Sequence, residues 1–183
     1  RVKQAMSKAE DLYGNPSSYN EKGREARELL EASRLSIARF LGAHADEIIF
    51  TSSGSEANSL AIFGVAEKSD KPGEIITTPV EHISVLRCMD RLKRRGWKVR
   101  FLKVDSEGLV DLDDLRVKLN RNVRLVSIIY ANNEIGTIQP IKKMAKIIEE
   151  FNKKMEINGR KQVLFHADAC QAAGYLEMNV NNL

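Results

Sequence analysis

The stretch VRLVSIIY, residues 123–130, is the part of the sequence that most strongly indicates the fold. Its apolar residues are not confined to alternate positions, which is typical of a strand buried on both faces of a sheet. Residues 74–77, 98–104 and 162–165 are also expected to be strands, and helical stretches separate them. The sequence therefore predicts an α/β fold with a mainly parallel sheet covered by helices on both faces.

The other elements are predicted from the spacing of apolar residues and from glycines that end helices. The spacing predicts a helix that ends at Gly42, and residues 48–50 are expected to form a short buried strand. Further helices are predicted at residues 56–67, 83–95, 112–119 and 141–151, with a turn at Asn158-Gly159. No internal repeat or linker interrupts the alternation, so residues 1–183 are expected to belong to one domain.

Composition excludes several classes of protein. With 183 residues, 43% hydrophobic and 30% charged, the chain can bury a substantial core and is not disordered. Its apolar runs are too short for a membrane span, and residues 1–12 are expected to be a polar helix rather than a signal peptide. Two cysteines cannot supply a disulfide framework, which favours a reducing compartment and a cytoplasmic location. The basic run 91–95 has apolar neighbours at helical spacing, so we expect a solvated helix face and no nucleic-acid partner.

Candidate functional residues lie in four loops that follow predicted strands, where ligands bind in parallel sheets. The first loop is Ser52-Ser53-Gly54-Ser55-Glu56, directly before a helix. Small residues at a helix N-terminus suit a phosphate, which backbone amides and the Ser55 hydroxyl would hold. The same pattern fits an ordinary N-cap at Ser53 or Ser55. The loop is neither a P-loop, nor a dinucleotide fingerprint, nor a nucleophile elbow.

The second and third loops each allow two interpretations. His82, in Pro79-Val80-Glu81-His82, can cap the following helix, or its ring can stack on a flat ligand and move a proton. In Asn132-Asn133-Glu134-Ile135-Gly136, the amides can form an Asx-type turn or be aimed at a ligand.

The fourth loop is His166-Ala167-Asp168-Ala169-Cys170-Gln171. Asp168 needs a hydrogen bond or a cationic partner if it is buried, and a protonated ring nitrogen would serve. A metal site built from His166, Asp168 and Cys170 is a weaker alternative, because no second ligand cluster has recognisable spacing. Cys170 is otherwise expected to be a small packed thiol. Together the four loops offer the groups that a phosphorylated pyridine cofactor needs.

Several stretches resemble the cysteine desulfurases, which are class V aminotransferase-like, fold-type I enzymes dependent on pyridoxal 5′-phosphate (PLP). The most specific is Asn-Asn-Glu-Ile-Gly-Thr-Ile-Gln-Pro at residues 132–140, which favours the iron–sulfur and nitrogen-fixation type over the selenocysteine lyase-like branch. The others are Gly-Asn-Pro-Ser-Ser at 14–18 and residues 51–61, 81–82 and 166–171.

The resemblance implies a role for each candidate residue. Gly54 and Ser55 would hold the cofactor phosphate, and His82 would stack on the pyridine ring and shuttle protons as a catalytic residue. Asn133 and Gln171 would contact the side of the cofactor that carries the 3′-oxygen. Asp168 would pair with the pyridinium nitrogen.

The resemblance also implies a reaction and partners. Sulfur would be taken from L-cysteine, leaving L-alanine and an enzyme persulfide, and passed to an acceptor such as an iron–sulfur scaffold protein. The family implies a homodimer. No membrane partner is expected, because the apolar runs are too short. Two alternatives stay open: another class V enzyme (a selenocysteine lyase or an aminotransferase), or an inactive fragment that serves only as a binding partner. A metal-assisted hydrolase is a distant further alternative.

Some residues depart from the family pattern. Ser53 stands where the family usually has glycine, Ser59 where it often has asparagine, and Asn20 where a histidine is common. The Ser-x-His-Lys segment with the PLP-binding lysine is not present, and neither Cys88 nor Cys170 matches the persulfide cysteine. We therefore expect residues 1–183 to be the N-terminal half of a PLP-binding enzyme, a partial large domain that is inactive by itself.

Overall fold

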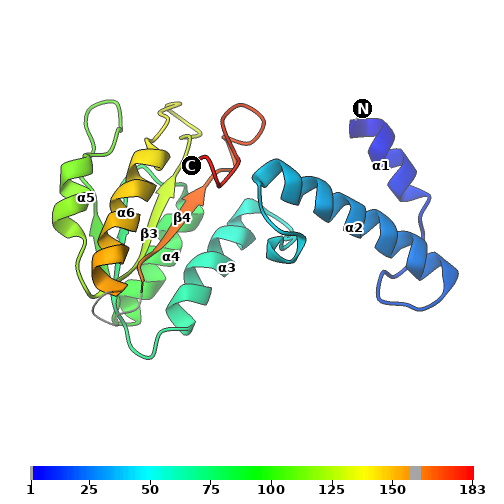
Figure 1. The fold of residues 1–183 in the computed structure, drawn as a ribbon, viewed down its shortest axis with the longest axis horizontal. Coiled ribbons are helices and arrows are strands. Elements are labelled where there is room, and N and C mark those ends of the chain that lie inside the picture. Colours follow the sequence, from blue (N-terminus) through cyan, green and yellow to red (C-terminus); the bar gives the residue numbers. More distant parts are fainter. Residues whose placement is uncertain (1, 157–161) are drawn as a thin grey trace. The chain divides into compact units, whose positions relative to one another are not determined.

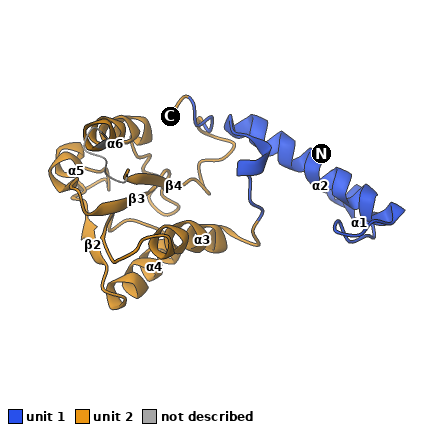
Figure 2. Ribbon diagram, turned by 60° about the horizontal axis from the view of Figure 1, so that its bottom comes forward, with its two compact units in different colours: residues 1–50, 178–181 blue, residues 51–177, 182–183 orange. Residues whose placement is uncertain are grey.

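The structure, a computed structural model, describes residues 2–156 and 162–183. The chain divides into two compact units, which Figure 2 shows in different colours. Unit 1 comprises residues 1–50 and 178–181, and unit 2 comprises residues 51–177 and 182–183. That residues 1–183 belong to one PLP-binding domain stays a prediction.

Unit 2 is built on a parallel sheet with the strand order β2-β1-β3-β4. Its strands are β1 (Glu74–Thr77), β2 (Lys98–Phe101), β3 (Val123–Ile129) and β4 (Leu164–Asp168). β1 pairs with β2 and β3, and β3 pairs with β4, so that Ile129 lies opposite Asp168. β3 is buried along its length apart from the partly exposed Arg124, as its apolar pattern predicts.

Helices cover both faces of the sheet (Figures 1 and 2). α3 (Gly54–Glu67) and α4 (Ile83–Arg94) lie on one face, and α5 (Leu112–Lys118) and α6 (Ile141–Glu156) lie on the other. The core beneath α3 and α4 includes Ile62, Met89 and Leu92, packed with Ile75 and Leu125 of the sheet. The predicted α/β class, with a parallel sheet between two helical layers, is therefore confirmed.

Two strand boundaries differ from the prediction. The strand expected at 98–104 ends at Phe101, because the chain then turns and Val104 forms an isolated antiparallel bridge with Val110. The strand expected at 162–165 begins at Leu164 and continues to Asp168. Asp168 is therefore the last residue of its strand rather than the start of a loop. The predicted turn at Asn158-Gly159 lies outside the described residues.

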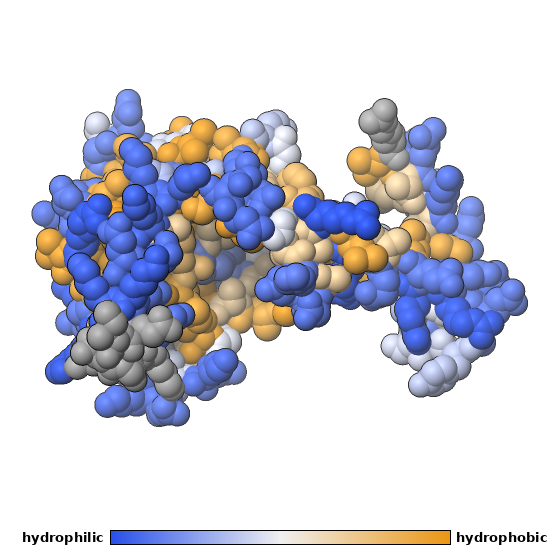
Figure 3. Space-filling model, viewed as in Figure 1, coloured by the Kyte–Doolittle hydropathy of each residue, from blue (hydrophilic) through white to orange (hydrophobic). Residues whose placement is uncertain are grey.

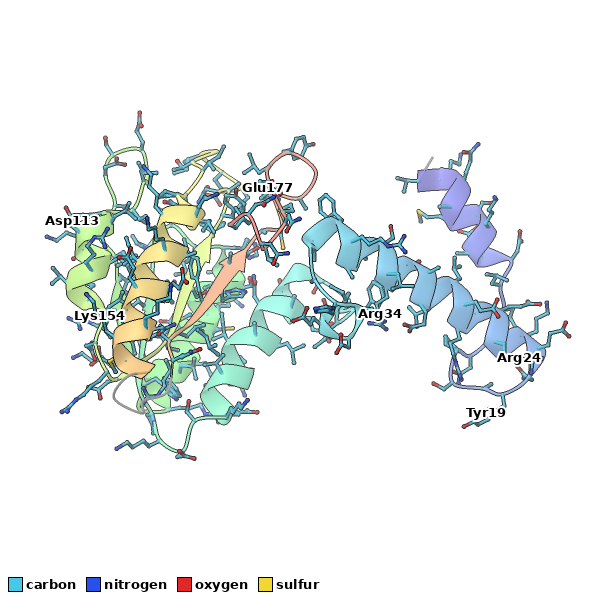
Figure 4. All side chains as sticks on the ribbon, viewed as in Figure 1. Tyr19, Arg24, Arg34, Asp113, Lys154 and Glu177 are labelled. Atoms are coloured by element: carbon cyan, nitrogen blue, oxygen red, sulfur yellow. The ribbon has the colours of Figure 1, made fainter. Side chains whose placement is uncertain are left out.

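The predicted strand at residues 48–50 was wrong. These residues follow a 3₁₀ helix, η1 (Ala45–Glu47), and Ile49 and Phe50 are 69% and 43% exposed. The segment is held instead by Arg34, labelled in Figure 4, which donates from Nη1 to the Ile48 carbonyl at 2.6 Å. The Arg34 guanidinium also lies 4.9 Å from the centre of the Phe50 ring. A three-residue apolar run becomes a strand only beside another strand, and no described strand pairs with it.

Unit 1 consists mainly of α1 (Val2–Glu10) and α2 (Glu21–Leu41). Asn20 caps α2, accepting a hydrogen bond from the Gly23 amide at 2.7 Å. α2 ends at Gly42, as predicted, because Gly42 adopts φ +67°, a left-handed conformation that glycine accepts at little cost. The returning segment fixes this end, where the Val180 amide donates to the Leu41 carbonyl at 2.8 Å.

Much of the apolar surface of α2 is exposed, and Figure 3 shows apolar side chains among the polar ones of unit 1. Among the helices that the structure describes, none has the length and apolar character needed to cross a membrane. The basic residues 91–95 are exposed around the fully buried Leu92, as predicted for a solvated helix face.

Candidate functional site

A pocket of about 210 Å³ lies where the carboxyl ends of β3 and β4 meet the N-termini of α3 and α4. It brings together residues from all four loops that the sequence singled out. Its lining residues are Ser53, Gly54, Ser55, Asn58, His82, Ile129, Ala131, Asn133, Asp168, Cys170 and Gln171. All six predicted site residues are in this set, although up to 117 positions of sequence separate them. Their individual roles stay predictions.

The N-terminus of α3 has both an ordinary N-cap and free groups that could bind a phosphate, the two interpretations that the sequence left open. Ser53 is the N-cap, and its hydroxyl accepts a hydrogen bond from the Glu56 amide at 3.3 Å. Ser55 does not cap the helix; it lines the pocket. Within the described chain, the amides of Gly54 and Ser55 have no hydrogen-bond partner. These two donors and the Ser55 hydroxyl, at the positive end of the helix dipole, suit an anionic group.

Gly54 is confined by the loop after β4. A Cβ added at Gly54 would lie 2.5 Å from the Cys170 sulfur, closer than real Cβ contacts. The close approach brings the N-terminus of α3 against the segment that carries Asp168 and Gln171. A larger residue at position 54 would push these two parts of the pocket apart.

His82 both caps a helix and lines the pocket. Its Nδ1 accepts a hydrogen bond from the Ser84 amide at 3.2 Å and lies 2.7 Å from the Ser84 hydroxyl. A ring nitrogen that accepts carries no proton, so the proton of the neutral ring is on Nε2. The cap therefore fixes the tautomer and leaves Nε2–H as the ring's donor.

The two interpretations of the third loop, an Asx turn and an amide aimed at a ligand, apply to different asparagines. Asn132 forms the Asx turn, because its Oδ1 accepts from the amides of Glu134 and Ile135 at 2.8 and 2.9 Å. Its Nδ2 donates to the Val80 carbonyl at 2.7 Å, which ties this loop to the one before His82. Asn133 is exposed and lines the pocket, and in the described part of the chain its amide has no partner. Asn133 is therefore the amide available to a ligand.

Asp168 is 5% exposed and is held by two donors. Asn58 donates from Nδ2 to Oδ2 at 2.7 Å, and the Cys170 amide donates to Oδ1 at 3.1 Å. Asn58 also donates to the Ser84 hydroxyl at 3.0 Å, so it links Asp168 to the His82 cap. Asn58 was not among the residues predicted for the site. The feature that could have indicated it is its position on the same face of α3 as the buried Ile62 and Ala66, where a polar side chain needs a partner.

Cys170 is not a packed thiol, which corrects the prediction. Its side chain is exposed at the wall of the pocket. Partial desolvation of the sulfur, with the neighbouring Asp168 acting in the same direction, raises the pKa of the Cys170 thiol to about 11. The thiol therefore stays protonated at neutral pH and is a poor nucleophile.

The residues of the alternative metal site are arranged differently. His166 Nδ1 lies 2.9 Å from the Ser127 hydroxyl, and burial lowers the pKa of His166. Across residues 2–156 and 162–183, no three His, Cys, Asp or Glu side chains are grouped to hold a metal ion.

A parallel sheet with free amides at a helix N-terminus, a histidine and a buried carboxylate at its carboxyl ends, among the described residues, has the architecture of the fold-type I PLP enzymes. The sequence matches the family Aminotransferase class-V over residues 1–183, and the chain belongs to this family. The enzymes of this family that it resembles depend on PLP.

Within the family, the chain is similar to cysteine desulfurases. It is 45% identical over 174 residues to cysteine desulfurase IscS of Dictyoglomus turgidum, covering 94% of this chain and 42% of that protein. A solved NifS-like protein superimposes with a TM-score of 0.87 at 36% identity, covering 98% of this chain and 47% of the other. The structure of SspA in complex with cysteine gives a TM-score of 0.88 at 31% identity, with 98% and 50% covered. The chain thus spans about half the length of the proteins that it matches.

Proposed function

We propose that this chain is the N-terminal, cofactor-binding part of a cysteine desulfurase that removes sulfur from L-cysteine and leaves L-alanine. The observation that carries the proposal is the pocket in which buried Asp168 faces the same space as His82 and the free amides of α3. The 45% identity to a cysteine desulfurase supports it, as does the bound cysteine in a structure with a similar fold.

The residues of the pocket fit PLP in their chemistry. The phosphate would be held by the Ser55 hydroxyl and by the amides of Gly54 and Ser55, on which no side chain of the described residues competes. Asp168, the buried carboxylate, would receive the protonated ring nitrogen. The unpartnered amide of Asn133 and the side chain of Gln171 would contact the 3′-oxygen side.

The bound cofactor would supply an electron sink for the bond that breaks at the α-carbon of the substrate. Asp168 would keep the proton on the ring nitrogen, and Asn58 would keep the Asp168 carboxylate in place through its 2.7 Å hydrogen bond. His82, with Nδ1 engaged by Ser84, would present Nε2 to the pocket for stacking and proton movement.

The sulfur nucleophile would come from outside these 183 residues. Cys88 is buried, and Cys170 has a pKa of about 11, so neither thiol suits the attack on a substrate sulfur. The lysine that carries the cofactor would also lie in the part of the enzyme that this chain does not span. The chain alone would then be inactive.

The proposal extends to partners and location. The product persulfide would pass to an acceptor protein such as an iron–sulfur scaffold, which the IscS name of the relative supports. We further propose a homodimer in the cytoplasm.

The test is turnover of L-cysteine by the full-length protein, with L-alanine as the measured product. Borohydride reduction followed by a peptide mass map would locate the lysine bonded to PLP. Asp168→Asn should lower turnover by about 100-fold or more, because a neutral amide cannot hold a pyridinium proton. The control is Glu107→Gln, an equal change of charge at an exposed residue outside the pocket. Undiminished alanine formation by Asp168→Asn would remove Asp168 from the mechanism.

A further inference from the structure

Glu81 is a buried carboxyl group to which no role has been given. It lies between β1 and α4, directly before His82, and is 6% exposed. Its Oε1 accepts hydrogen bonds from the Thr78 hydroxyl at 2.7 Å and from the Ile129 amide at 3.0 Å. The second contact joins this loop to the last residue of β3. Glu81 therefore fastens the His82 loop to the centre of the sheet.

The second oxygen of Glu81 is in a different situation. Oε2 is buried and has no hydrogen-bond partner among the described residues. An ionised carboxylate would spread its charge onto this oxygen, and burying a charge without a partner costs far more than burying a neutral group. The surroundings of Oε2 therefore favour the protonated acid.

The charged groups near Glu81 act in the same direction. Asp168 lies opposite Ile129 in the β3–β4 register, on the strand next to the one that Glu81 contacts. Of the histidines nearby, His82 is engaged by Ser84, and His166 of β4 lies beside Ser127. The other titratable residues of β1, β3 and α4 are Glu74, Arg124, Arg87, Cys88, Asp90, Arg91, Lys93 and Arg94. Within the described ranges the partners of Glu81 are the Thr78 hydroxyl and the Ile129 amide, and neither carries a charge. When two carboxyl groups are buried in the same region, ionisation of one disfavours ionisation of the other.

Asp168 is the better site for the single negative charge of this pair. Both of its oxygens accept hydrogen bonds, one from the Asn58 amide and one from the Cys170 backbone. In Glu81, Oε1 accepts hydrogen bonds, whereas Oε2 has no partner among the residues that the structure describes. Environments that differ in this way separate the acidities of two carboxyl groups and give them different roles.

We infer that Glu81 is kept as a neutral carboxylic acid in the folded protein below neutral pH, and that it is a positioning residue which holds the His82 loop on β3 while Asp168 carries the negative charge. The consequence for catalysis rests on the proposed function, because it assumes that Asp168 receives the ring nitrogen. The protonation state and the positioning role do not depend on it.

The acidity of Glu81 agrees with this inference. Burial, and to a smaller degree the charge of Asp168, raises the pKa of Glu81 to about 7 from its ordinary value of 4.5, against the opposing hydrogen bonds from Thr78 and Ile129. A folded-state pKa above the unfolded value means that stability falls as pH rises from about 4.5 to about 7. Above that range Glu81 would be a second negative charge beside Asp168.

The test compares Glu81→Gln and Glu81→Ala with the wild type in the full-length protein, without cofactor. Glutamine is neutral, keeps an oxygen for Thr78 and Ile129, and replaces the acid O–H by N–H. We expect Glu81→Gln to be as stable as the wild type at about pH 5, and to lose the decline in stability that the wild type shows up to about pH 7. Glu107→Gln, at an exposed glutamate, should keep that decline.

A second measurement reads the protonation state directly. Carboxyl-labelled glutamate should show, by ¹³C NMR, one resonance that titrates near neutral pH and is missing in Glu81→Gln. In PLP-binding assays near pH 6, Glu81→Ala should bind several-fold more weakly than the wild type, and Glu81→Gln should restore the affinity.

Two results would overturn the inference. One is a Glu81 resonance that titrates at the ordinary value for glutamate. The other is a Glu81→Gln variant that is as unstable as Glu81→Ala at every pH, which would mean that an ionised carboxylate is required. If PLP does not bind the wild type at all, the proposed function fails, while the NMR and stability results still decide the state of Glu81.

Discussion

Glu74 and Glu81 are buried glutamates at opposite ends of the same strand, and their surroundings differ. Glu74, at the start of β1, accepts hydrogen bonds from Arg100 at 3.2 Å and Asn120 at 3.0 Å, and its other oxygen lies 3.5 Å from Lys98. Burial opposes its ionisation, but Asn120, Lys98 and Arg100 together outweigh burial and lower the pKa of Glu74. Glu81 lies beyond the end of β1. Its Oε2 has no hydrogen-bond partner among the described residues, and its pKa is about 7.

The difference distinguishes the amino ends of the strands, where polar groups are paired and stabilise the fold, from the carboxyl ends, where polar groups are kept free. At the amino ends of the strands, the buried carboxylate has its partners supplied by the chain itself. At the carboxyl ends, the amides of Gly54 and Ser55 and the side chain of Asn133 have no partner among the described residues. Groups left unsatisfied in this way cost stability, and they are the groups that a ligand can use.

The sharpest test of this comparison is at the two asparagines of the pocket. Asn58→Ala should lower the free energy of unfolding by about 2 kcal/mol, because it leaves Oδ2 of the buried Asp168 without its donor. Asn133→Ala should leave stability nearly unchanged, since its side-chain amide has no hydrogen-bond partner among the described residues, but should weaken PLP binding. Urea unfolding of both variants, without and with PLP, measures the two effects. Equal losses of stability would contradict the division between structural and ligand-directed amides.

A smaller effect is expected at the other end of the sheet. Glu74→Gln should lower the free energy of unfolding by about 1 kcal/mol at pH 7. Because the folded pKa of Glu74 lies below its ordinary value of 4.5, this contribution is present above that pH and is lost as pH falls through the folded pKa. Acid titration of stability should therefore bring the wild type and the variant together at low pH. Glu149→Gln, at an exposed pair with Lys153, is the control and should change little.

Turnover of L-cysteine by the full-length protein also distinguishes the amino end of the sheet from the carboxyl end. Glu74→Gln should leave the reaction with L-cysteine unchanged, because Glu74 is outside the pocket. A large loss of activity with unchanged stability would mean that the amino end of the sheet also serves the reaction.

The sequence was enough to predict the elements of unit 2, because each has its own period and its own stop signals. The apolar run in β3 indicated a buried parallel strand, and the rule for carboxyl ends then located three of the four pocket loops. The fourth, before α3, lines the pocket although the strand predicted before it is not formed. Residues 48–50 show where local pattern fails. Their apolar side chains suit a strand, but Arg34 of α2 takes the Ile48 carbonyl that a ladder would need.

The contacts that define the site could not be predicted, because they join residues distant in sequence. Asn58 and Asp168 are 110 residues apart, and Glu81 and Ile129 are 48 apart. A single sequence shows the residue types but not these pairings. The residue pattern by itself did not distinguish Asn132 from Asn133. The resemblance favoured Asn133 as the ligand contact, and the structure shows that Asn132 turns the loop.

The smallest expected effect on stability concerns His82, whose two roles can be separated by two substitutions. His82→Ala removes the cap of α4 and should cost about 0.5 to 1 kcal/mol of unfolding free energy. His82→Asn supplies a side-chain oxygen that caps at least as well, so its stability should match the wild type. Both variants lose the aromatic ring.

If the ring contacts the cofactor, the two variants should lose PLP affinity and turnover to a similar extent, although only one of them loses stability. PLP binding and urea unfolding measured on the same samples make the comparison. If His82→Asn binds PLP and turns over L-cysteine as the wild type does, His82 is only a cap. The ring would then have no part in the reaction, and the histidine would be grouped with Glu74 among the residues that serve stability alone.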